Sequence, residues 1–174
     1  NTDIDSLLKS ADYLADRGIY TVRMGQVVEK PLRTSNPKII DYATFHRTDF
    51  GDVYLVAKCS FFLGCTSGII TVAQIFNVPI AWTNLIPLWH LPLGNRDIFI
   101  PKTLVRTEDS QQIRFPEIME SGMYEWYESS WYEEAGISVV ENSSDEILEL
   151  TKEMLGRLYG LWDSCSGDEE IQNQ

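Results

Sequence analysis

The stretch FFLGCTSGIITVAQIFNVPIAW, residues 61–82, decides the fold that the sequence predicts. It reads as a buried strand, a short polar turn, an apolar helix and a second buried strand. The turn, Thr66-Ser67-Gly68, opens the helix and leaves free backbone N–H groups, which suit an anion such as a phosphate. Open α/β folds bind nucleotides at the carboxyl ends of parallel strands, so this unit predicts a sheet together with a place for a ligand.

Helix and strand patterns alternate along the rest of the chain. Helical spacing occurs over residues 4–15, 49–58 and 143–161, and the last helix opens with a capping box of Ser143 and Glu146. The alternation predicts an α/β fold, a Rossmann-like and mostly parallel sheet with helices on both faces. The strands of this sheet are expected near residues 19–24, 39–43, 61–65, 78–82 and 137–141.

Residues 83–120 break this order, because they contain four prolines and no sustained period. They are predicted as a long loop of the kind that often carries function. A helix rich in aromatic residues is expected over residues 122–135, suited to stacking on a sugar or base or to packing on the core or a partner. Residues 1–163 are expected to form one domain, and 164–174 a polar tail.

The amino-acid composition limits the classes of protein to which this chain can belong. An apolar content of 44% and an aromatic content of 11% support a folded core. No apolar run is long enough to span a bilayer, and no signal peptide is evident. The three cysteines and two histidines show no metal-ligand spacing, so neither a metal nor a cofactor is expected. An odd number of cysteines without a secretion signal predicts reduced thiols and a cytoplasmic location.

Charge is unevenly distributed along the chain, whose net charge is −12. Residues 1–107 carry 11 Lys and Arg against 9 Asp and Glu, whereas residues 108–174 carry 3 against 17. An anionic ligand should therefore favour the first part, and the second part should repel nucleic acid. The acidic second part is also typical of a solvated surface.

Candidate ligand residues lie at the ends of the predicted strands. Arg23 and Gly25 end the 19–24 strand, where an arginine can pair with phosphate at the same edge as the Thr66-Ser67-Gly68 turn. In the alternative interpretation, Arg23 is a surface arginine beside a turn glycine, and Thr66-Ser67-Gly68 is an ordinary helix cap.

The predicted long loop adds three candidates, for which a ligand role and surface salt bridges are both open: Asn84, Asp97 and Lys102.

Several short motifs follow one another in a recognisable order. They are Asn1-Thr2-Asp3-Ile4, Gly18 to Val22-Arg23-Met24-Gly25, Ile40-Asp41-Tyr42-Ala43, Asp49 to Asp52-Val53-Tyr54-Leu55, Phe62 to Gly68, Val78-Pro79 to Thr83-Asn84, and Asp97 to Lys102. Over roughly residues 1–120 this order resembles a bacterial family of glycosyltransferase-like proteins. That family is similar to the carboxyl-terminal domain of two-domain GT-B glycosyltransferases, and the turn is similar to the phosphate turn of fucosyltransferases.

The resemblance implies a transferase domain that binds a nucleoside diphosphate sugar as its donor. Thr66, Ser67 and Gly68 match the phosphate-turn positions, and Arg23 and Gly25 match a strand end that faces the same cleft. Such enzymes have a further strand and an acceptor-binding domain before the position of Asn1. The resemblance therefore implies a missing N-terminal domain as partner, little transfer activity by this chain alone, and an open edge or face prone to self-association.

Two other functions stay open. A nucleotide-sugar epimerase of the same two-domain type would use acid and base carboxylates, for which Asp49, Asp52 and Asp97 are the candidates. A non-catalytic interaction domain would dock a partner through the aromatic segment 124–132. Binding of a nucleoside diphosphate separates both enzymes from the interaction domain.

Overall fold

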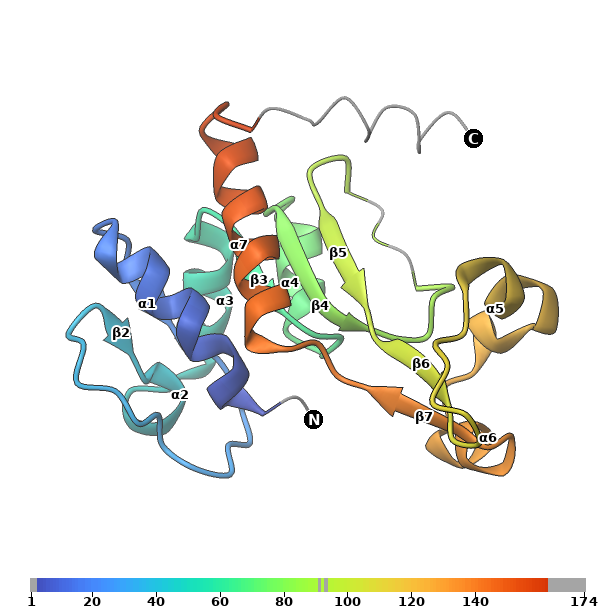
Figure 1. Ribbon diagram of the computed structural model, residues 1–174. Coiled ribbons are helices and arrows are strands. Elements are labelled where there is room, and N and C mark those ends of the chain that lie inside the picture. Colours follow the sequence, from blue (N-terminus) through green and yellow to red (C-terminus); the bar gives the residue numbers. More distant parts are fainter. Residues whose placement is uncertain (1–2, 91, 93, 163–174) are drawn as a thin grey trace.

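A three-stranded parallel sheet lies at the centre of the computed structural model, which describes residues 3–90, 92 and 94–162. Its order is β3 (Phe62–Gly64), β4 (Ile80–Leu85) and β5 (Ile98–Pro101), with β4 in the middle (Figure 1). Leu63 pairs with Ala81 on one side of β4, and Ala81 pairs with Ile98 on the other. The 61–82 unit therefore consists of a strand, a turn, a helix and a second, parallel strand, in the order that the sequence predicts.

A second parallel pair lies earlier in the chain. It consists of β1 (Thr21–Val22) and β2 (Ile39–Ile40), in which Thr21 pairs with Ile39. The predicted strand over 39–43 is too long, because Asp41 ends it. The Asp41 side chain accepts a hydrogen bond from Thr44 N and caps the short helix α2 (Tyr42–Phe45).

Helices cover both faces of the central sheet. On one face, α3 (Asp49–Lys58) and α4 (Ile70–Ile75) supply Val56 and Ala73, which pack with Ile80 and Trp82 of β4. On the other face, Leu150 and Met154 of α7 (Ser144–Leu158) pack with Ala81 and Ile98. Successive side chains of a strand point to opposite faces, so β4 joins the two cores.

The N-terminal helix α1 (Leu8–Asp16), preceded by the 3₁₀ turn η1 (Ile4–Leu7), packs beside α7 (Figure 1). The buried hydroxyls of Ser10 and Thr151 form a hydrogen bond of 3.1 Å between these two helices. The prediction of a mixed α/β fold with parallel strands and helices is confirmed, and the arrangement is compatible with a Rossmann-like fold.

The chain between β5 and α7 forms a separate antiparallel ribbon covered by short helices. β6 (Thr103–Arg106) pairs with β7 (Ile137–Val140), Leu104 lying opposite Val139. Two predictions are wrong here. Residues 83–120 are not one loop, because they hold the end of β4 together with β5, β6 and α5 (Phe115–Ser121). The 137–141 strand is antiparallel and lies outside the parallel sheet.

The predicted aromatic helix over 122–135 is also divided. Gly122 adopts a left-handed conformation (φ 79°) and starts the 3₁₀ turn η2 (Met123–Glu125). Trp126 is extended, and α6 (Ser129–Glu134) begins after it. The buried Tyr132 donates a hydrogen bond from its hydroxyl to Trp126 O (2.7 Å), which holds the break in place.

The predicted capping box of α7 is confirmed. Glu146 N donates to Ser143 Oγ at 3.2 Å, and Ser143 N donates to Glu146 Oε2 at 2.7 Å. Two N–H groups at the start of the helix are thereby satisfied reciprocally. The helix ends at Leu158, three residues before the end of its predicted range.

We expect Ser143→Ala to lower the free energy of unfolding by about 0.5–2 kcal/mol, because it removes the N-cap oxygen. Urea denaturation followed by circular dichroism measures this change. Ser130→Ala is the matched control, since Ser130 is an exposed serine of α6 that makes no hydrogen bond through its side chain among the described residues. An equal effect of the two substitutions would show that the cap does not stabilise α7.

Candidate functional site

The turn between β3 and α4 is exposed at the carboxyl edge of the central sheet. Thr66, Ser67 and Gly68 are all solvent-exposed. Ser67 O and Gly68 O accept hydrogen bonds from Ile70 N (3.2 Å) and Thr71 N (3.3 Å). Residues 67–71 therefore form two overlapping turns, each closed by a hydrogen bond between residues three apart. Within the described ranges, the N–H groups of residues 66–69 donate no hydrogen bond to the protein.

These free donors define what the turn can do chemically. Four successive N–H groups without a protein partner among the described residues can donate to the oxygens of an anion. α4 spans only six residues, so its dipole is short and the hydrogen bonds themselves carry the attraction. A Cβ placed on Gly68 would meet no atom within 4 Å, which leaves room for a ligand to approach its backbone.

Arg23 lies at the end of β1, but the structure engages its side chain within the chain. Its Nη1 donates to Lys30 O at 2.7 Å and lies 3.5 Å from both carboxylate oxygens of Asp41. The two side chains are only 8% and 7% exposed. Arg23 therefore has an observed structural role, and its binding to a phosphate stays a prediction.

Gly25 and Met24 place the end of β1 near α4. Gly25 has a φ of 152°, which L residues rarely adopt, and a Cβ there would lie 3.2 Å from Val28 Cγ1. Met24 packs against the core cluster that contains Ile70 and Val56. Met24, just after β1, and Ile70, at the start of α4, thus share one core. No hydrogen bond joins the end of β1 to the Thr66–Gly68 turn among the described residues.

Asp41 is held as a carboxylate by its neighbours. Burial raises the pKa of Asp41, but hydrogen bonds from Leu32 N and Thr44 and the charge of Arg23 outweigh burial. The net effect is a pKa below the ordinary value of 3.8. A lowered folded-state pKa means that ionised Asp41 stabilises the fold above the unfolded-state pKa, and that this stabilisation is lost as the pH falls.

We expect Asp41→Asn to be less stable than the parent at pH 7, with a difference in unfolding free energy that shrinks as the pH falls below about 4. Denaturant melts from pH 7 to pH 3 measure it. Asp12→Asn is the control, since Asp12 is exposed and forms no ion pair among the described residues. A difference that stays constant over this pH range would contradict a stabilising charge on Asp41.

The three candidates of the predicted loop lie at two different ends of the sheet. Asn84 and Lys102 lie at the carboxyl ends of β4 and β5, where Lys102 N donates to Leu85 O at 3.2 Å. Asp97 lies at the amino end of β5, and its Oδ1 accepts a hydrogen bond from Ile80 N at 2.9 Å. The structure therefore does not bring Asp97 together with the other two.

Asn142 is a buried polar residue that the sequence reasoning missed. Asn84 N donates to Asn142 Oδ1 (2.5 Å) and Asn142 N donates to Asn84 Oδ1 (2.6 Å), while Asn142 Nδ2 donates to Pro101 O (2.8 Å). Asn84 has a φ of 53°, in the region that asparagine tolerates better than most residues. The only local signal for Asn142 is an amide directly after a strand, which does not reveal a partner 58 residues away.

We expect Asn142→Ala to lower the unfolding free energy by at least about 2 kcal/mol, because buried donors and acceptors lose their partners. Denaturant melts measure the loss. Asn95→Ala is the matched control, since Asn95 is exposed and forms no hydrogen bond through its side chain among the described residues. A loss as small as that of Asn95→Ala would mean that water replaces Asn142 without cost.

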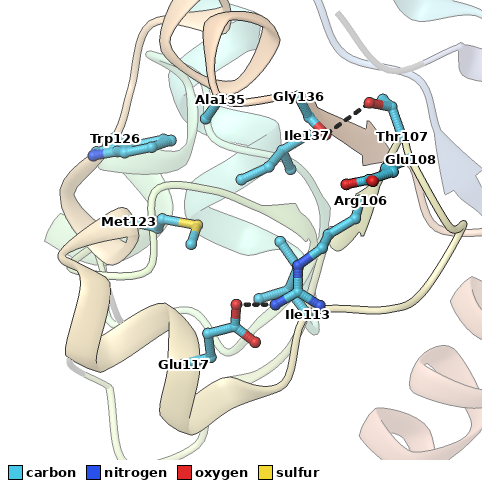
Figure 2. A pocket seen from close by; sticks show the side chains of 10 residues that line it. All are labelled: Arg106, Thr107, Glu108, Ile113, Glu117, Met123, Trp126, Ala135, Gly136 and Ile137. Atoms are coloured by element: carbon cyan, nitrogen blue, oxygen red, sulfur yellow. Dashed lines mark hydrogen bonds and ion pairs between the residues drawn. The ribbon is translucent and has the colours of Figure 1, made fainter.

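A hollow of about 430 Å³ lies between the β6–β7 ribbon and α5. Figure 2 shows that Met123 and Ile137 project into it, that Trp126 lies at one side, and that an ion pair of Arg106 and Glu117 lies at its opposite side. An apolar floor beside an aromatic ring and a charged pair suits a small amphipathic ligand. This hollow does not include the Thr66–Gly68 turn.

The aromatic residues of 124–132 divide between core and surface. Tyr132 is buried, with its ring edge-on to Trp126 at 5.3 Å between centroids. Tyr127 and Trp131 are exposed and form their own edge-on pair at 4.9 Å. Packing on the core therefore accounts for part of the segment, and its exposed pair stays available to a ligand or partner.

No family model matches the chain, and comparison with curated proteins and with solved structures gave no significant match.

Two further features were sought over the described residues. No helix there is long and apolar enough to cross a bilayer. No three His, Cys, Asp or Glu side chains within the same ranges gather as metal ligands.

Proposed function

We propose that the chain is the donor-binding domain of a GT-B-type glycosyltransferase and binds a nucleoside diphosphate sugar at the Thr66–Gly68 turn. The observation that carries the proposal is the run of unbonded N–H groups over residues 66–69. They follow a strand of a parallel sheet and lie at its carboxyl edge, where open α/β folds bind nucleotides. The order of the motifs that resemble the glycosyltransferase family supports the same assignment.

The diphosphate is the part of the donor that this turn would recognise. Its oxygens would accept hydrogen bonds from the backbone of residues 66–69 and from the hydroxyls of Thr66 and Ser67. During transfer of the sugar, negative charge builds up on the leaving diphosphate. Donors already in place stabilise that charge without reorganisation, which is an electrostatic contribution that requires no metal ion.

The acceptor and the catalytic base are assigned to no residue of this chain. The proposal is therefore a binding function, and its readout is affinity for a nucleotide. Transfer needs a second wall of the cleft that places the acceptor against the donor.

We expect Gly68→Val to weaken nucleotide binding at least tenfold and Ser67→Ala to weaken it about two- to tenfold. The valine blocks close approach to the backbone, whereas the alanine removes one hydrogen bond worth about 0.5–1.5 kcal/mol. Calorimetric titration with GDP, UDP, CDP and inorganic pyrophosphate measures both. The open space around Gly68 means that its variant should unfold like the parent, which separates lost binding from lost structure.

Ser130→Ala serves as the control for Ser67→Ala, because both replace an exposed serine. Parent-like affinity in both turn variants would place the nucleotide elsewhere. No measurable binding of any nucleoside diphosphate by the parent chain would overturn the donor-binding function and favour the interaction domain.

A further inference from the structure

The hollow between the β6–β7 ribbon and α5 has the dimensions of a small-molecule site. Its volume of about 430 Å³ lies within the range of about 300–1,000 Å³ that is typical of ligand pockets. The Thr66–Gly68 turn does not line it, so a ligand bound here is separate from the proposed nucleotide. The side chains around the hollow indicate what kind of ligand this is.

The floor of the hollow is apolar and the wall beside it is aromatic. Ile113, Met123 and Ile137 line it and are buried. Figure 2 shows the indole nitrogen of Trp126 turned away, so that the carbon edge of the ring borders the hollow. The backbone of Trp126 is fixed by hydrogen bonds to Met123 O (3.1 Å) and from the hydroxyl of Tyr132 (2.7 Å). An apolar ligand body therefore meets a preformed surface.

Small residues between α6 and β7 leave the hollow open. Gly136 adopts a left-handed conformation (φ 67°), and a Cβ there would lie 3.4 Å from Thr107 Oγ1. Ala135 lines the hollow with a single methyl group and is itself exposed. A larger side chain at position 135 would therefore occupy the hollow without entering the buried core.

The charged residues that line the hollow leave one negative charge unbalanced. They are Arg106, Glu108 and Glu117, and Arg106 is already paired with Glu117. Within the described residues, the carboxylate of Glu108 forms no ion pair and no hydrogen bond. Figure 2 shows its oxygens directed toward the hollow, across from Trp126. A ligand that lies on the apolar floor thus has a free carboxylate at one end.

The backbone that carries Glu108 is held in a tight turn. Arg106 N donates to Gln111 O at 2.9 Å, and Ser110 N donates to Arg106 O at 3.0 Å. The hydroxyl of Thr107 donates to Gly136 O at 2.9 Å and ties the turn to the start of β7. A carboxylate on a fixed backbone loses less conformational freedom when it binds a partner.

We propose that this hollow binds a small organic amine, in which an ammonium group is attached to a compact apolar body. The body lies on Met123 and Ile137 beside Trp126, and the ammonium group donates hydrogen bonds to Glu108. A ligand with a carboxylate would instead meet Glu108 as a like charge, and it could reach Arg106 only by displacing Glu117.

The test is an NMR titration of the full chain with phenethylamine, phenethyl alcohol and hydrocinnamate, which share an aromatic body and differ in charge. We expect shifts of the Met123 methyl and Trp126 indole signals. The amine should bind about two- to fivefold more tightly than the alcohol, the range expected of an exposed ion pair, and the carboxylate should bind more weakly than both. Butylamine, which has the charge of a lysine side chain but no aromatic body, should bind more weakly than phenethylamine.

Glu108→Gln should abolish the preference for the amine over the alcohol. Glu120→Gln is the matched control and should keep it, because Glu120 is an exposed glutamate of α5 that does not line the hollow. Ala135→Leu should weaken binding of both ligands at least tenfold by filling the hollow, while denaturant melts show that the variant unfolds like the parent.

Three results would overturn the proposal. Shifts that do not include Met123 and Trp126 would place the amine elsewhere. Equal affinity for butylamine and phenethylamine would mean that charge alone attracts the ligand. A preference for the amine that persists in Glu108→Gln would show that this carboxylate does not select it.

Discussion

The burial of β4 is the constraint on which the rest of the structure depends. All six of its residues are buried, and Ile80, Ala81 and Leu85 have no exposed surface. A strand in this position must pair on both edges and be covered on both faces, because its backbone and side chains have no access to water. β3 and β5 satisfy the edges, while α3 with α4 and α7 cover the faces. Burying each large aliphatic side chain contributes about 1.5–3 kcal/mol, so the layered arrangement follows from this one strand.

The carboxyl end of β4 is where the parallel sheet is joined to the second half of the chain. The reciprocal hydrogen bonds of Asn84 and Asn142 tie β4 to the start of α7, and the bond from Asn142 to Pro101 O adds the end of β5. These groups are buried, so leaving any one of them unpaired costs about 1–3 kcal/mol. These hydrogen bonds therefore fix the start of α7 against the carboxyl end of the sheet. The same edge carries the exposed turn after β3, so buried polar groups and an exposed polar turn share one side of the sheet.

The parts of the fold that could be predicted are those whose signals are local. The 61–82 unit and the capping box at Ser143 are contiguous patterns, and both are present as predicted. The pairing of β6 with β7 joins residues more than 30 positions apart, and Pro101 between short apolar runs made β5 and β6 resemble a loop. Which two strands pair in this way depends on which strand edges remain free after the core has formed. The local hydrophobic pattern of the sequence holds no information on this. The same holds for the candidate site: the exposed turn at 66–68 could be located from its residues, whereas the pairing of Arg23 with Asp41 and of Asn84 with Asn142 could not.

The uneven distribution of charge along the sequence carries over to the folded chain. The unbonded N–H groups of residues 66–69 belong to the part of the chain with a slight excess of Lys and Arg, and α7 belongs to the acidic part. Three carboxylates of α7 already have a cationic partner, since Asp145 pairs with Lys9, Glu149 with Lys152 and Glu153 with Arg157. Exposed charges are screened over about 8 Å at physiological ionic strength, so these surface ion pairs act locally. The buried ion pair of Arg23 and Asp41 follows a different rule, since its charges are withdrawn from solvent and act on each other rather than on a ligand. Net charge thus says little about the strand end at Arg23 or the surface of α7, because burial and local pairing decide which charges a ligand can reach.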